Sequence, residues 1–183
     1  MRPPLVAFFW AALGAGHPAR DGSVAPATSP AEDLVVFDAR PLLGAGRDPF
    51  DAIHDQLGRL APGGILALVT PFRPRPLEGL LAGRGFVVDV LEPVHPEDVA
   101  HVMLVHAGAA VHDLVDLPAP EPMEAVLRAA ADLAPGASLV ARLPRFPNLL
   151  LPRLDERGLV HLARPLPDDL GGSVLRLDHP AAP

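Results

Sequence analysis

The sequence predicts an α/β protein that contains two copies of one unit, each with the order strand, helix, strand, helix, strand, strand. Three observations predict this fold class. The motif LAPG occurs at residues 60–63 and again at 133–136, and the pattern around it repeats at the same offset without a gap. Short apolar runs alternate with stretches of helical spacing. Hydrophobic residues make up 49% of the chain, enough to form a buried core.

The internal repeat sets the expected domain boundaries. Residues 61–86 align with residues 134–159, with leucine, proline and Arg-Gly positions coinciding along the alignment. Biased composition would not readily supply ordered leucines in one gapless register, so we interpret the segments as copies of one unit. We therefore expect a first domain over 34–107 and a second over 112–179, after an N-terminal extension over 1–33.

The elements of the first copy follow from its hydrophobic periodicity. The apolar run LVVF at 34–37 suits a buried strand. A helix is expected from Pro49, because proline is favourable in a first helical turn, and Asp48 is placed to cap it. One face of this helix would carry Phe50, Ile53, Leu57 and Leu60. Further strands are expected over 65–69, 86–91 and 99–105, and a second helix over 74–85, which ends in glycine.

The second copy repeats these elements with one shorter connection. Its first apolar stretch ends at Asp116, and a helix is expected to open near Pro122. The helical stripe would be Met123, Val126, Ala130 and Leu133, preceded by Glu121. Strands are expected over 138–143, 158–163 and 172–177. The first copy has five extra residues in the corresponding connection, within ARPLLGAGRD.

The strands of the first copy are apolar on both faces. Val35 and Val36 point in opposite directions, as do Leu66 and Ala67. Two helices on one side of a sheet can cover only one of its faces. We expect the second copy to cover the other face and form an internal pseudo-dimer; a homodimer that uses the same face is the alternative.

Composition excludes several classes of function. Lys and Arg number 15 against 22 Asp and Glu, a formal charge of −7, and this balance argues against a nucleic-acid-binding surface. No apolar run is long enough to span a bilayer. The absence of cysteine excludes disulfides, a thiolate nucleophile and a persulfide carrier. The apolar stretch at 5–16 is interpreted as part of an extension of a cytoplasmic protein, with a secretory signal as the less favoured alternative.

The segment VDLPAPEP at 115–122 resembles the signature of the TusA/SirA-like superfamily of small bacterial sulfur-carrier proteins. That signature places Cys-Pro between a strand and its first helix, and Ala119-Pro120 here stands at the position of the Cys-Pro. DARPLLGAGRDPFDAI (38–53) and TPFRPRPLEGLLAGRGF (70–86) are similar to a bacterial domain-of-unknown-function family within that superfamily. The resemblance covers roughly residues 34–178.

The resemblance implies a fold and a metabolic setting, but no reaction. Each βαβαββ repeat would be a two-layer sandwich, a mixed four-stranded sheet with two helices on one face. The setting it suggests is redox, sulfur or nitrogen-oxide metabolism. The second copy lacks the DxRPLL part and would be the degenerate one, with Ala119 in place of the reactive cysteine.

The loops of the first copy hold the main candidate site, formed by Asp38, Arg40, Asp48, Phe72, Arg73 and Arg75. The connections after the first and second strands should lie at one edge of the sheet, where α/β proteins commonly bind ligands. The guanidinium groups of Arg40, Arg73 and Arg75 could hold a small anion. The alternative is structural: Arg40 pairs with Asp48 to fix the long loop, and the other two arginines are solvated.

The sequence offers little support for a metal site or for covalent catalysis. His95, His101, His106 and His112 lie close in sequence, but His101 and His106 should face opposite sides of one strand, and no HxH or HExxH spacing occurs. His54 is expected to flank a helix. The serines lie in linkers or at strand starts, with no base implied nearby. We expect no metal, no catalytic residue and no bound cofactor.

These patterns favour a non-enzymatic binding or adaptor module that presents the first-copy loops to a protein partner or a small anion. A cysteine-independent enzyme or cofactor-delivery protein that uses the same Arg/Asp loop is the alternative. A secreted structural protein is a third possibility.

Overall fold

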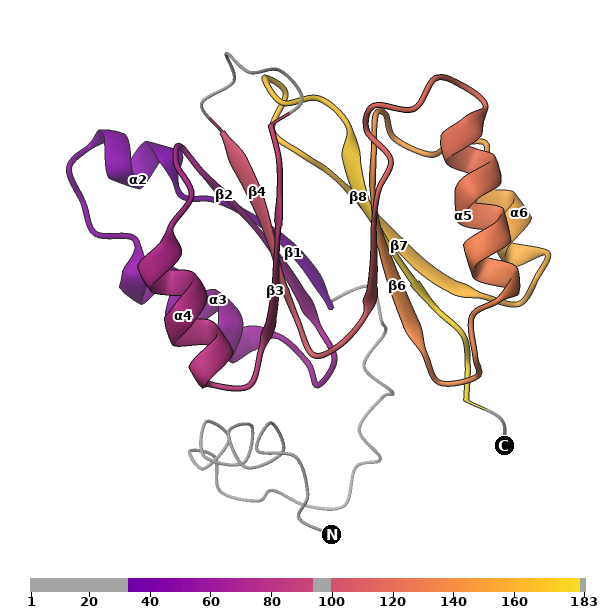
Figure 1. Cartoon of the computed structure of the whole chain (residues 1–183), viewed down its shortest axis with the longest axis horizontal. Helices are drawn as coiled ribbons and strands as arrows, with labels where there is room; N and C mark the ends of the chain where they lie inside the picture. The colour runs from indigo at the N-terminus through magenta and orange to yellow at the C-terminus, as the bar shows by residue number, and fades with distance from the viewer. Residues whose placement is uncertain (1–32, 94–99, 182–183) are drawn as a thin grey trace, which may run out of the picture.

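The computed structural model describes residues 33–93 and 100–181 and contains two similar repeats (Figure 1). The first repeat consists of β1 (Leu34–Asp38), α2 (Arg40–Gly44), α3 (Phe50–Arg59), β2 (Ile65–Thr70), α4 (Arg75–Gly83), β3 (Val87–Leu91) and β4 (His101–His106). The second consists of β5 (Ala110–Asp113), α5 (Glu121–Ala131), β6 (Ser138–Leu143), α6 (Leu151–Asp155), β7 (Val160–Pro165) and β8 (Ser173–Asp178).

Each repeat forms a mixed four-stranded sheet with the same topology. The strand orders are β1-β2-β4-β3 and β5-β6-β8-β7. The first two strands of each repeat are parallel, and the remaining pairs are antiparallel. The predicted α/β class and the strand–helix–strand–helix–strand–strand order are confirmed in both repeats.

The helices cover the outer faces of the two sheets, and the inner faces pack against each other (Figure 1). Along β2, Leu66 and Leu68 face the helices, while Ala67 and Val69 face the other sheet. Val140 and Val174 of the second repeat belong to the same apolar cluster as Ala67 and Val69. The internal pseudo-dimer predicted from the doubly apolar strands is therefore what the structure shows.

Two arginines of the second repeat lie buried at the margins of this interface. Arg142 of β6 donates to the Asp113 carboxylate at 2.5 and 2.8 Å, and to the carbonyl oxygen of Glu92 in the first repeat at 2.7 Å. Arg176 of β8 donates to Asp178 at 3.0 and 3.1 Å and to the carbonyl oxygen of Asp33 at 3.2 Å. Each buried charge is thus paired within its own repeat and hydrogen-bonded across the interface.

A buried histidine holds the joint between the repeats. His106 is only 1% exposed, and its Nδ1 accepts the backbone N–H groups of Gly108 and Ala109 at 3.1 and 2.9 Å. Because Nδ1 is an acceptor in both bonds, the ring hydrogen of the neutral tautomer is on Nε2, which lies 2.7 Å from the Asp89 carboxylate. The turn that leads into β5 is therefore fixed by a side chain of the preceding strand.

Several expected boundaries need correction. The extra residues of the first repeat form the short helix α2 rather than a loop, because Leu43 packs onto the helix-side core. The first strand of the second repeat ends at Asp113, three residues before Asp116. The residue at the α3 N-cap is Pro49, although the Asp48 carboxylate does accept the N–H of Phe50 at 2.9 Å.

The predicted helical stripes are largely confirmed. Ile53, Leu57 and Leu60 are buried, whereas Phe50, expected on the same face, is 38% exposed. In the second repeat Val126 and Ala130 are buried, and Met123 and Leu133 pack against the same core. No helix within 33–93 or 100–181 has the length and apolar character needed to cross a bilayer. The extension at 1–32 and His95 lie outside the described residues.

Gly172, just before β8, is a position where only glycine fits. Its φ is +75°, and a Cβ there would overlap the carbonyl oxygen of Leu143. We expect Gly172→Ala to lower the free energy of unfolding by about 2 kcal/mol or more, measured by urea denaturation. Gly171→Ala is the matched control, since Gly171 has a φ of +62° but open space around it, and it should cost less. Equal losses in both variants would contradict this explanation.

The buried contacts of Arg142 should stabilise the packing of the two repeats against each other. Arg142→Met removes the ion pair with Asp113 and the bond to the Glu92 carbonyl. We expect a loss of about 1–3 kcal/mol in the free energy of unfolding, because Asp113 is partly exposed and can rehydrate. Arg145→Met, at an exposed position, should change stability by less than about 0.5 kcal/mol. An unchanged midpoint for Arg142→Met would contradict a stabilising role.

Candidate functional site

In each repeat, the connections that lead from the first two strands into helices lie at one edge of the sheet, and we call this region the mouth of the repeat. The first mouth comprises the connections that follow β1 and β2, and the second mouth comprises those that follow β5 and β6. Because β1 and β2 are parallel neighbours, with Asp38 opposite Val69, both connections leave the same sheet edge, as predicted. In Figure 1 α2 and the start of α5 both lie toward the upper end of the molecule.

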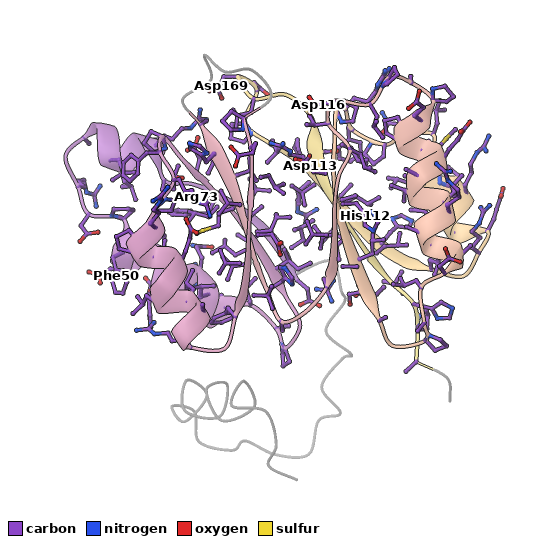
Figure 2. All side chains as sticks on the ribbon, viewed as in Figure 1. Phe50, Arg73, His112, Asp113, Asp116 and Asp169 are labelled. Carbon is purple, nitrogen blue, oxygen red and sulfur yellow. The ribbon has the colours of Figure 1, made fainter. Side chains whose placement is uncertain are left out.

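Arg40 in the first mouth is held by carboxylates of both repeats. Its Nε and Nη2 donate to Asp38 at 2.9 and 2.7 Å, and its Nη1 and Nη2 donate to Asp169 in the connection between β7 and β8. Asp169 is labelled at the upper edge of Figure 2. These bonds lower the pKa of both carboxyl groups and raise the pKa of Arg40. We call this cluster the Arg40 clasp.

The other candidate residues of the first mouth do not come together around one point. Arg73 donates to Glu78 at 2.9 and 3.0 Å, and this contact lowers the pKa of the glutamate. Phe72 is 54% exposed, and Arg75 is exposed at the start of α4. Asp48 serves the start of α3. The structural alternative predicted an Arg40–Asp48 pair, and that partner is wrong: Asp38 is adjacent along the chain, and Asp169 arrives from the other repeat.

The second mouth holds an open apolar pocket of about 370 Å³. One wall comes from the connection before α5 and the first turn of that helix, and the other comes from the connection between β6 and α6. The lining residues are Ala119, Pro120, Pro122, Met123 and residues 143–150. The peptide bond between Ala119 and Pro120 is cis. The degenerate Cys-Pro position therefore lies at a pocket rather than in a closed turn.

The chemistry of this lining is nearly all apolar. The polar side chains among the lining residues are Arg145 and Asn148, and no Ser, Thr, Asp, Glu or His lines the pocket. Phe146 and Leu149 at the rim are 39% and 81% exposed. Such a surface can hold an apolar group of another molecule, but it offers no nucleophile, general acid or general base.

The described histidines do not lie together as ligands of a metal ion. His101 shares its strand face with Met103 and Val105, which face the helices, and His106 shares the opposite face with Leu104. The prediction that His101 and His106 face opposite sides is confirmed. Within the described ranges, no three His, Asp or Glu side chains are placed to hold a metal ion.

The Uncharacterized conserved protein family DUF2249 matches the chain twice, at residues 36–103 and 111–169. The chain belongs to this family. The two matches coincide with the two repeats and support a tandem domain of unknown function. No curated protein and no solved structure matches the chain.

The partners of Arg40 and Arg73 were not predicted from the sequence. Glu78 lies five residues after Arg73, which precedes the predicted helix, and this is not the three- or four-residue spacing of neighbours on a helix face. Asp169 is 129 residues from Arg40, and nothing in the local sequence indicates their contact. The pocket was missed for a similar reason, because its second wall at 143–150 follows a strand that only the fold brings beside Ala119.

The Arg40 clasp should make stability depend on acid pH. The folded-state pKa of Asp38 lies below its ordinary value of about 3.9, so the stabilisation is present above about pH 4 and is lost as pH falls through the lowered value. We expect Asp38→Asn to be less stable than the wild type at pH 7, by urea denaturation, and the gap to narrow below about pH 4.

Asp116→Asn is the control for this experiment, because Asp116 is exposed in the connection between β5 and α5 and is not in the first turn of a helix. Its pH profile should follow that of the wild type. A gap between Asp38→Asn and the wild type that stays constant down to pH 2 would show that the ionised carboxylate is not what the clasp requires.

Proposed function

We propose that the protein is a non-enzymatic binding module and that the second mouth is its binding surface. The observation that carries this proposal is the pocket beside Ala119: it is open, apolar and without a reactive group. In the proteins that this chain resembles, a reactive cysteine stands at this position. Here the opening is kept, and the side chain at the position is the methyl group of Ala119. Binding without covalent chemistry is the function such a surface supports.

The first mouth is less suited to this role. Arg40 already has four hydrogen bonds to two carboxylates, and Arg73 is paired with Glu78. An incoming anion would have to displace these acids. The first-mouth ligand site therefore remains a prediction, and the enzyme that would use its Arg/Asp loop remains the alternative function.

A protein partner fits the exposed rim of the second mouth. Leu149 and Phe146 present exposed apolar surface around the hollow, and protein interfaces concentrate binding energy in apolar contacts that become buried. The resemblance to TusA-like proteins supports a setting in redox, sulfur or nitrogen-oxide metabolism and a cytoplasmic location. The proposal includes no nucleic-acid partner, in keeping with the net charge of −7.

Two measurements test this function. Assays with thiosulfate, polysulfide, nitrite and nitric oxide should show no turnover above the rate in buffer. In affinity capture from native host extract, a partner held by the wild type should be lost with Leu149→Asp and kept with Leu80→Asp. Leu80 is the control because it is 39% exposed on α4, outside the pocket lining.

The opposite results would overturn the proposal. Turnover that disappears in Arg40→Ala or Arg73→Ala, with the fold intact, would favour the enzyme. A captured partner that tolerates Leu149→Asp would remove the second mouth from the binding surface.

A further inference from the structure

We infer that the second mouth binds a small amphiphilic carboxylate, with its apolar chain in the pocket and its carboxylate on Arg145. This inference rests on the proposed function and specifies the ligand chemistry of the same surface. The small molecule would occupy the pocket, while the protein partner of the proposed function would contact the exposed rim.

The size and lining of the pocket suit a small ligand. Its volume of about 370 Å³ lies at the lower end of the range of about 300–1,000 Å³ that is typical of ligand sites. Pro120, Pro122 and Met123 at the start of α5 and Leu143 at the end of β6 supply apolar surface from the two walls. Ligand sites characteristically combine such walls with a few polar groups, here Arg145 and Asn148.

Arg145 supplies the charge that selects an anion. Nothing in the described part of the chain pairs with its guanidinium, although its backbone oxygen accepts the Ser173 hydroxyl at 3.1 Å. No acidic side chain lines the pocket. A guanidinium can bind a carboxylate through two parallel hydrogen bonds. The charge at this pocket is therefore available to a ligand.

The two mouths differ in their charged residues at equivalent positions. At the offset of 73 residues, Phe146 and Leu151 correspond to Arg73 and Glu78. The first mouth thus contains a paired arginine and glutamate, whereas the second has two apolar residues at the same positions. The arginine of the second mouth is one residue earlier, at 145, where the first mouth has Phe72. The second mouth therefore has an arginine but a leucine at the position that corresponds to Glu78.

The absence of cysteine provides a direct test. Ala119→Cys places a single thiol in the pocket lining, at a position that is exposed. Alkylation of this thiol by N-ethylmaleimide is followed by mass spectrometry with octanoate, 1-octanol or octylammonium, each below its micelle concentration. Octanoate should slow alkylation in a saturable way, at a concentration about tenfold lower than either other probe requires.

A second substitution tests whether Arg145 is responsible for the preference for a carboxylate. Added to Ala119→Cys, Arg145→Gln should raise the octanoate concentration for half-protection about tenfold and leave that for octanol unchanged. Arg75→Gln, at an exposed arginine of the first repeat, is the matched control and should change neither. Isothermal titration of octanoate into the wild type and the Arg145→Gln single variant gives the same comparison without the introduced thiol.

The possible failures are distinguishable. Equal protection by octanoate and octanol, unaffected by Arg145→Gln, would overturn the carboxylate while leaving an apolar binding pocket and the proposed function. Absence of both protection and titration heat with octanoate would overturn this inference. The proposed function is judged separately, by turnover and by the Leu149→Asp capture experiment.

Discussion

The face-to-face packing of the two sheets is the constraint on which the rest of the structure depends. Each sheet has helices on one side only, yet the central strands of the first sheet are apolar on both sides, and those of the second place Val140 and Val174 on the inner face. The first repeat alone would expose a face of Val, Leu and Ala side chains to water, at about 25 cal/mol for each Å² left unburied. Burying each face against the other repeat removes that cost and fixes how the repeats sit together (Figure 1).

This packing also determines how the two mouths differ. It brings the connection between β7 and β8 over the first mouth, where Asp169 completes the Arg40 clasp. The five extra residues there form α2, and Leu43 ties that helix to the core. The second mouth has a shorter connection and no such helix, and it stays open beside Ala119. Arg40 and Arg73 of the first mouth are thus paired with carboxylates, whereas the second mouth keeps accessible apolar surface.

The fold was more predictable than the site, for a physical reason. Strand and helix positions depend on periodicity within about ten residues, which the sequence displays directly: residues 138–143 form a strand with the expected ends. The two-sided character of Leu66 and Ala67 even predicted the packing of the repeats. Side-chain partners across the fold, such as Arg40 with Asp169, depend on three-dimensional approach. So does a pocket whose walls are some 25 residues apart, and local patterns contain neither.

The two buried arginines show what fusion of the copies into one chain allows. Arg142 and Arg176 lie on the inner face of the second sheet, and the equivalent positions of the first sheet are Val69 and Leu104. In a symmetric dimer every substitution appears on both faces, so each new charge would have to be accommodated twice. A covalent tandem breaks that symmetry. One copy can then evolve as scaffold while the other explores new surfaces, with their association secured by the chain itself.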